Sequence, residues 1–483
     1  MMTLEEKGAK IAGIVLGGSA VFFVVVSFYL AYHFDWTQLG SSLASLLLYG
    51  GTSALMALLC FSALRLKASH KINAALLLGS AGASIYSVEL LLTIWVSLPS
   101  VQDEMEERAR VNAAQQMGVP FDRRTHFEVA GDLRRQGIEA YPTSHSPALL
   151  EEQPDGSLRS KLNLGREVLP LGWISNRISV LCNESGEYVV YDSDEHGFHN
   201  PRGLWRRGGV EIAVVGDSYP HGYCVPSDRN FVALIRRRYP ATLNLGMAGH
   251  GPLFMLGTIK EYAEVVKPGL VLWFYYEGND LKNLRMEKDS PLLMRYLEGD
   301  FRQGLVDHQA DIDRLLMAHI AAATDGMARK REIVEILSDP GELLGRGRDM
   351  ITLSRLRRQL GVLPPIARLD WPRERRARRP EAPLDLLTKS LMRAKDSVRA
   401  WGGELHFVYL PHWHRYAEPR AAEGHRDRVL EIARAVGLNV IDVHEAFAGH
   451  PDPLGLFALR LHNHYNEAGH RVVAEAVLRS IPR

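Results

Sequence analysis

Cysteine is scarce in this chain, with three residues among 483. Three thiols are too few for a scaffold built on disulfides or for a zinc site of four cysteines. An excess of charge of either sign is also missing, because 57 Lys and Arg residues are balanced by 56 Asp and Glu residues. The balance gives no reason to expect nucleic acid as a partner. Internal repeats and low-complexity tracts are absent as well, and 46% of the residues are hydrophobic, enough to bury a core.

Charged residues are almost missing from three long apolar runs near the N-terminus. The runs lie at 11–32, 37–64 and 72–98, and Glu89 is the one charged residue among them. Each run exceeds the ~20 residues that a helix needs to cross ~30 Å of hydrocarbon. We therefore predict three transmembrane helices in residues 1–100, in preference to a cleaved signal peptide or a buried soluble hairpin. An acid inside a span is a functional candidate by default, but for Glu89 we favour a structural role.

The loops around these runs predict the orientation of the chain. Positive residues precede the first run and separate the second from the third: Lys7, Lys10, Arg65, Lys67 and Lys71. The loop at 33–36 has no Lys or Arg, and acidic residues follow the third run. Because Lys and Arg stay on the cytoplasmic side, we expect a multi-pass protein of the inner membrane with a cytoplasmic N-terminus. Everything after about residue 100 is then periplasmic or otherwise extracytoplasmic.

Residues 101–207 differ from the rest of the chain in their mixed pattern. They begin with a charged helical stretch, typical of a stalk, and continue with short alternating pieces and turns rich in Gly and Asn. We interpret this part as a stalk followed by a small mixed α/β segment.

Residues 208–483 alternate between two kinds of pattern. Five short apolar runs are typical of buried strands, at 211–215, 242–245, 270–276, 405–410 and 439–443. Helical patterns separate them, at 231–238, 258–266, 384–401 and 426–435. This alternation predicts an α/β fold with a parallel sheet covered on both faces. A charged and mostly helical stretch at about 283–383, with a basic patch at 373–379, is interpreted as an insertion over the sheet.

Polar motifs lie where the predicted strands end. Ser218 follows the first strand in GDS (216–218), and Gly249 closes NLGMAG (244–249) after the second. Asn279 follows the third strand in GND (278–280), and His464 opens HYNEAG (464–469) before a C-terminal helical stretch. Open parallel sheets bind ligands at this edge. A serine hydroxyl there becomes a nucleophile when an imidazole takes its proton.

These four motifs, in this order, resemble those of the SGNH (GDSL-type) hydrolase family over about residues 208–290 and 403–483. The resemblance implies a flavodoxin-like three-layer sandwich with a parallel five-stranded sheet. It also implies that Ser218 is the nucleophile and His464 the general base. The oxyanion hole would combine the Ser218 N–H, the Gly249 N–H and the Asn279 side chain. Chemistry of this kind requires no metal and no other cofactor.

The sequence departs from the family at the acid of the triad. Members usually carry an Asp two or three residues before the catalytic His, and here Leu461 and His462 occupy those positions. The acid must then come from elsewhere, with Asp452 or Glu467 as candidates, or be replaced by a backbone carbonyl.

Histidines and aromatic residues after the fourth strand are further candidates. We expect His412, Trp413 and Tyr416 to line the substrate cleft. The pairs His412/His414 and His462/His464 each have the H-x-H spacing of a zinc site, but no convincing third and fourth ligand is visible, so we expect no metal.

The cysteines differ in their predicted location. Cys182 and Cys224 would both lie on the oxidising side, and the sequence leaves open whether they pair. Cys60 lies within the second predicted span and cannot join them.

Together these features predict a membrane-anchored, extracytoplasmic serine ester hydrolase or acyltransferase. Relatives that combine membrane spans with an exported domain of this type act on O-acetyl groups, so the resemblance implies O-acyl groups of an envelope polysaccharide as substrate. The expected partners are this ester-bearing glycan and the lipid of the inner membrane, without nucleic acid. Two alternatives stay open: a non-catalytic envelope protein that binds carbohydrate or assists assembly, and a lipid esterase. The sequence indicates no oligomeric state.

Overall fold

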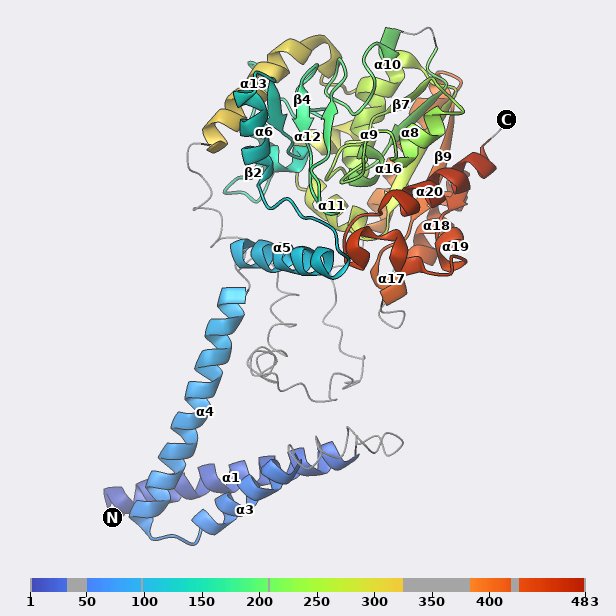
Figure 1. Cartoon of the computed structure of the whole chain (residues 1–483). Coiled ribbons are helices and arrows are strands. Elements are labelled where there is room, and N and C mark those ends of the chain that lie inside the picture. Colours follow the sequence, from blue (N-terminus) through green and yellow to red (C-terminus); the bar gives the residue numbers. More distant parts are fainter. Residues whose placement is uncertain are drawn as a thin grey trace. The chain divides into compact units, whose positions relative to one another are not determined.

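The computed structural model describes residues 2–32, 50–96, 99–206, 209–324, 383–417 and 425–481 (Figure 1). The chain divides into two compact units, of which the first contains the N-terminal residues up to Glu104. The second consists of residues 105–330 and 380–483. Each unit is described by itself.

The first unit is helical. Helices α1 (Leu4–Tyr32), α3 (Gly51–Ala63) and α4 (Ala68–Val96) pack together through small apolar side chains that include Ala12, Ala63 and Ala75. Two segments, Leu4–Phe28 and Ala68–Leu91, are long and apolar enough to span a membrane. They correspond to the first and third predicted spans, and Glu89 is buried.

The second predicted span is described only in part. Helix α3 covers 13 residues at its C-terminal end, and residues 37–49 lie outside the described residues. Two candidate spans are therefore found where three were expected. Membrane insertion of these segments stays a prediction.

A five-stranded sheet forms the centre of the second unit. Its strands are β6 (Ile212–Val215), β7 (Thr242–Asn244), β8 (Leu270–Tyr276), β9 (Glu404–Leu410) and β10 (Asn439–Asp442). They lie in the order β10-β9-β8-β6-β7, and every neighbouring pair is parallel. The predicted α/β fold with a parallel five-stranded sheet is thus confirmed. When the strands are numbered along the chain, this order is the flavodoxin-like 2-1-3-4-5. Successive strands are added first on one side of β6 and then on the other, so the switch point of the topology lies between β6 and β8.

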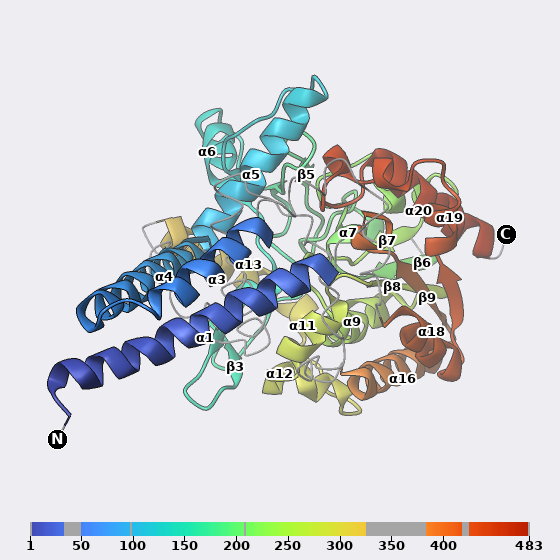
Figure 2. The ribbon, with the colours of Figure 1, turned by 90° about the horizontal axis from the view of Figure 1, so that it is seen from below.

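Helices cover both faces of the sheet (Figure 2). Because side chains alternate along a strand, Trp273 and Phe274 of β8 belong to opposite core clusters. Trp273 packs with residues of α9 (Pro252–Thr258), α16 (Leu384–Ala400) and α18 (Arg426–Ala435). Phe274 packs with residues of α8 (Phe231–Arg236), α19 (His444–Ala448) and α20 (Glu467–Ser480). The result is a three-layer arrangement of helices, sheet and helices.

The segment before the sheet belongs to the same compact unit. Helices α5 (Pro99–Gln116) and α6 (His126–Arg135) are followed by two small sheets. One sheet contains β1 (Ala140–Pro142), β4 (Ile178–Val180) and β5 (Val190–Asp192), and the other contains β2 (Leu150–Glu152) and β3 (Leu158–Ser160). The side chain of Trp173 is buried in the core cluster that also contains Trp273. This segment is therefore packed onto the central domain.

Shorter helical elements connect these parts. The helix expected at 258–266 continues from α9 as a π-helix (Ile259–Ala263) and α10 (Glu264–Val266). The described part of the predicted insertion is helical and contains α11 (Asp280–Glu287), α12 (Pro291–Met294) and α13 (Gln309–Thr324). Residues 325–382, with the basic patch, lie outside the described residues. Two further short α-helices are α7 (Ser218–His221) and α17 (His414–Ala417).

Candidate active site

Ser218 lies at the carboxyl end of β6, where it begins the short helix α7. The preceding Asp217 caps this helix, because its Oδ1 accepts a hydrogen bond from the Tyr219 N–H at 3.0 Å. The first N–H groups of a helix have no acceptor within the helix, so the Ser218 N–H remains available to an anion. The serine is buried, with 7% of its surface exposed.

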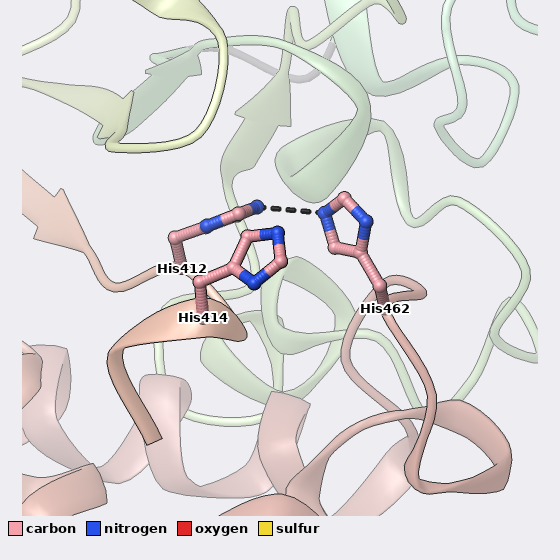
Figure 3. Close-up of side chains that lie close together, drawn as sticks. All are labelled: His412, His414 and His462. Atoms are coloured by element: carbon pink, nitrogen blue, oxygen red, sulfur yellow. Dashed lines mark hydrogen bonds between the residues drawn. The ribbon is translucent and has the colours of Figure 1, made fainter. Parts of the chain in front are cut away.

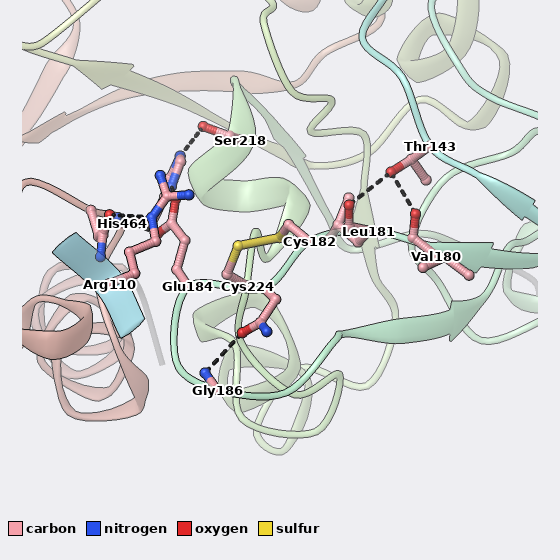
Figure 4. The surroundings of a disulfide bond; sticks show 12 residues. Arg110, Thr143, Val180, Leu181, Cys182, Glu184, Gly186, Ser218, Cys224 and His464 are labelled. Atoms are coloured by element: carbon pink, nitrogen blue, oxygen red, sulfur yellow. Dashed lines mark hydrogen bonds and ion pairs between the residues drawn. A yellow bond between two sulfur atoms is a disulfide. The ribbon is translucent and has the colours of Figure 1, made fainter. Parts of the chain in front are cut away.

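His464 forms a hydrogen bond with Ser218. The distance between Ser218 Oγ and His464 Nε2 is 2.8 Å (Figure 4). The loop that carries the histidine is fixed at both sides, because the His464 carbonyl accepts from the Ala458 N–H and Asn466 caps α20. The two residues that the family motifs predict as nucleophile and base are thus brought together across 246 positions of sequence.

Glu184 supplies a carboxylate to the other side of the imidazole. Its Oε1 lies 2.9 Å from His464 Nδ1, and its Oε2 accepts a hydrogen bond of 2.7 Å from the His464 backbone N–H. The side chain of Glu184 is 8% exposed. A serine, a histidine and a glutamate are therefore hydrogen-bonded in series, the arrangement of a catalytic triad.

Sequence reasoning missed Glu184 and chose other candidates for the acid. The alternatives were Asp452, Glu467 and a backbone carbonyl, but His464 Nδ1 is bound by Glu184. Asp452 pairs instead with Arg460, and Glu467 with Arg229. Glu184 lies in the segment between β4 and β5, far from the family motifs. One signal could have indicated it: a disulfide between Cys182 and Cys224 would place the residues around both cysteines near each other.

That disulfide is present (Figure 4). Cys182 and Cys224 are bonded with a Cα–Cα distance of 5.2 Å across 42 positions, which resolves the question that the sequence left open. The bond connects the segment of Glu184, two residues after Cys182, to the chain that follows α7. It therefore holds the acid near the nucleophile. Cys60, in the first unit, is unpaired and buried.

His464 and Glu184 are buried together, and each changes the pKa of the other. Burial by itself would lower the pKa of His464, but the charge and hydrogen bond of Glu184, together with the charge of Asp217, raise that pKa above the ordinary value. Burial by itself would raise the pKa of Glu184, but the charge and the hydrogen bonds of His464 hold it below the ordinary value. The site thus favours an ionised carboxylate beside an imidazole that accepts a proton readily.

Arg110 supports this pair from helix α5. Its Nε donates to Asn463 Oδ1 at 3.2 Å, next to His464 in the chain, and its charge further lowers the pKa of Glu184. Nothing in the family motifs indicates this residue.

Gly249 and Asn279 lie at the same edge of the sheet. Gly249 has φ +80°, and a Cβ at this position would lie 3.1 Å from the Cβ of His145, so both backbone and space favour glycine. No described residue accepts a hydrogen bond from its N–H. Asn279 precedes α11, and its buried Oδ1 has no partner among the described residues. The free N–H of Gly249 is a donor that can bind an anion, whereas the free Oδ1 of Asn279 is an acceptor. The Asn279 side chain is hydrogen-bonded to Asp217; burial raises the pKa of that carboxyl, and this hydrogen bond lowers it.

Glu287 fixes the loop between Gly249 and α9. Its two carboxylate oxygens accept hydrogen bonds from the Gly251 N–H at 2.6 Å and the Leu253 N–H at 2.8 Å. Burial raises the pKa of this carboxyl to about 8, although these N–H groups act in the opposite direction. The residue comes from α11, and sequence analysis did not identify it.

The three residues expected to line the cleft make different side-chain contacts. His412 lies next to His414 and His462 (Figure 3). The Trp413 indole donates to the Arg460 carbonyl at 3.2 Å. Tyr416 shares a hydrogen bond of 2.9 Å with His444 Nδ1 and packs against the second core cluster. Trp413 packs against the same cluster as Tyr416, and all three residues are half-buried.

Fold and site together define an α/β protein with a serine, a histidine and a glutamate in series at the carboxyl edge of a parallel sheet. No family model matches the chain, and no curated protein matches it. Several solved structures are similar in fold.

One of them is a protein assigned to the G-D-S-L lipolytic family from Desulfitobacterium hafniense DCB-2, with 12% identity, a TM-score of 0.31, and coverage of 56% of this chain and 100% of that one. Another is a lipase/acylhydrolase from Enterococcus faecalis, with 12% identity and a TM-score of 0.28. The match covers 56% of this chain and 94% of that chain. A third is an acetyl-xylooligosaccharide esterase from Geobacillus Stearmophilus, with 13% identity and a TM-score of 0.29. The match covers 57% of this chain and 95% of that chain.

Proposed function

We propose that the chain is a serine ester hydrolase or acyltransferase of SGNH type, with Ser218 as nucleophile. The observation that carries this proposal is the hydrogen-bonded series Ser218–His464–Glu184. A lone serine at a helix start is an ordinary cap, but a serine whose Oγ lies 2.8 Å from an imidazole backed by a buried carboxylate is an activated nucleophile.

Each residue of the series has a role in acyl transfer. The Ser218 Oγ attacks the ester carbonyl while its proton passes to His464 Nε2. Glu184 accepts the hydrogen bond from Nδ1–H, which keeps the proton off Nε2 beforehand and stabilises the imidazolium that forms. The N–H groups of Ser218 and Gly249, with the Asn279 amide, stabilise the oxyanion of the tetrahedral intermediate.

The second half of the reaction releases the acyl group. The alcohol leaves with the proton from His464, and the acyl group remains as an ester on Ser218. Water or a sugar hydroxyl then attacks this ester, His464 takes its proton, and Ser218 is regenerated. Hydrolysis and transfer differ only in this acceptor.

A cavity beside the site supports a polar substrate, and we propose O-acyl groups, such as O-acetyl groups, of an envelope polysaccharide. The cavity has a volume of about 460 Å³. Its lining combines aromatic rings with charged and amide groups and includes Arg110, Trp173, Asn183, Glu184, Tyr188 and Tyr223. A lipid esterase would require a mainly apolar cleft for its acyl chains.

The experiment that tests the nucleophile is labelling of the full chain with a fluorophosphonate. We expect stoichiometric label on the wild type and none on Ser218→Ala. Ser227→Ala is the matched control, because Ser227 also lies 2.8 Å from an imidazole Nε2, that of His199, and its loss should leave the label unchanged. A folded wild type without label would instead support the non-catalytic carbohydrate-binding or assembly protein.

The substrate class has a separate test. Release of acetate from O-acetylated oligosaccharides is compared with hydrolysis of acetyl and long-chain aryl esters. Preference for the acetylated sugar supports the glycan, and preference for long acyl chains supports the lipid esterase.

We further propose that the apolar N-terminal helices anchor the protein in the inner membrane with the catalytic unit outside the cytoplasm. The apolar segments Leu4–Phe28 and Ala68–Leu91 and the five basic residues around them support this topology. A reporter that is active only after export, fused after Arg483, should be active. A signal from a cytoplasm-only reporter at the same position would contradict the topology and the envelope substrate together.

A further inference from the structure

Three histidine rings from two separate segments meet at the surface near the candidate active site (Figure 3). His412 and His414 follow β9, and His462 lies in the loop before α20. A ring nitrogen of each lies within 4.8 Å of the other two. The sequence presented these residues only as two H-x-H pairs, and no convincing third or fourth ligand was visible beside either pair.

The cluster has the dimensions of a metal site. His412 Nε2 and His462 Nε2 are 2.7 Å apart, and the ring centroids of His414 lie 4.8 Å from those of both other rings. Two nitrogens bound to zinc at about 2.0–2.1 Å in tetrahedral geometry are about 3.3 Å apart. A small outward movement of the exposed His462 ring would provide this distance.

A hydrogen bond between imidazoles explains only part of the cluster. It pairs His412 with His462, but the buried Nδ1 of His414 has no partner among the described residues. None of the three rings forms an ion pair with a described carboxylate. Three imidazole nitrogens that lie this close together, without a carboxylate partner, suit a metal cation that prefers imidazole ligands.

We propose that His412, His414 and His462 form a binding site for a divalent transition-metal ion, with Zn²⁺ as the representative ligand. Three protein ligands leave a fourth position open to water. The ion would connect the segment after β9 to the loop that carries His464, two residues beyond His462. The site also adjoins the oxyanion residues, because the His412 ring lies against Gly278, the neighbour of Asn279: a Cβ on Gly278 would be 2.7 Å from His412 Cδ2.

The test uses the full chain, stripped with a chelator and titrated with Zn²⁺ by calorimetry. We expect one Zn²⁺ per chain at this site, a higher Tm when zinc is present, and no displacement by Mg²⁺. His414→Gln and His462→Gln should each weaken zinc binding at least about tenfold and abolish the rise in Tm. Cys60, the one unpaired cysteine among the described residues, is present in every variant and does not affect the comparison.

His308→Gln is the matched control, because its side chain is 44% exposed and lies outside the cluster. It should bind zinc like the wild type. Equal affinities of His462→Gln and His308→Gln, or an unchanged Tm on addition of zinc to the wild type, would refute the site. Fluorophosphonate labelling of Ser218 in chelator reports whether each variant is folded. If His414→Gln fails to fold because His414 is less exposed, His462→Gln still tests the site.

Discussion

Replacing Glu184 with glutamine tests the role of this residue with almost no change of shape. The His464 backbone N–H donates to Oε2, so the amide oxygen of the glutamine must keep that position. The amide NH₂ then occupies the position of Oε1, which faces Nδ1 at 2.9 Å. Nδ1 must become an acceptor, and the imidazole proton moves to Nε2. A histidine with a proton on Nε2 cannot take the proton of Ser218.

The expected loss of rate follows from this change of tautomer. Correct general-base catalysis contributes about 10²–10⁴-fold, equivalent to about 3–5.5 kcal/mol of transition-state stabilisation. We expect kcat of Glu184→Gln to fall by this factor, with KM little changed. Because glutamine imposes the wrong tautomer, it should restore no activity relative to Glu184→Ala.

The pH dependence provides a second measure. In the wild type the Glu184 carboxylate raises the pKa of His464, so kcat/KM should begin to fall at a pH above the ordinary pKa of histidine. Without the carboxylate, burial and the charge of Arg110 lower that pKa more than the charge of Asp217 raises it, so the acid limb of Glu184→Gln should move to lower pH.

The assay is hydrolysis of an aryl acetate by the full chain from acid to neutral pH, with Tm as a check on folding. Glu187→Gln is the control, because it is exposed in the same segment and should behave like the wild type. A near wild-type rate in Glu184→Gln, or an acid limb that moves to higher pH, would refute the assignment of Glu184.

Other features of the structure lead to further predictions. Asn279→Ala should lower kcat by about 10²–10³-fold at unchanged Tm if the amide stabilises the oxyanion, and a wild-type rate would remove it from that role. Replacing Cys182 and Cys224 together by serine should reduce the free energy of unfolding in urea by about 4 kcal/mol, the value for a closed loop of this length. A change below 1 kcal/mol would contradict the expectation. Arg415→Ala should destabilise the protein by about 3–5 kcal/mol, because it leaves the Glu277 carboxylate, only 10% exposed, without its partner. The double variant with Glu277→Gln should recover part of this loss, and no recovery would show that the pair is not coupled.

Local patterns predicted the parts of the fold that depend on neighbouring residues. The strands β6 to β10 were visible as short apolar runs because a buried parallel strand must be apolar on both faces. Ser218, Gly249 and Asn279 follow three of these strands, and the carboxyl ends of parallel strands meet at one edge whatever the intervening chain does. His464 lies in the loop before α20, so its contact with Ser218, found at 2.8 Å, was implied only by the resemblance to the SGNH family.

The sequence by itself thus determined the α/β fold, the parallel sheet and the edge at which the polar motifs gather. Tertiary structure alone decided the residues around them, because their contacts join distant segments without any periodic pattern. Glu184 reaches His464 across 280 positions, and a single carboxylate in an irregular loop carries no sign of its partner. His462 meets His412 across 50 positions for the same reason. Periodicity records which face of an element is buried, but only the packed chain determines which isolated polar side chains come within hydrogen-bonding distance.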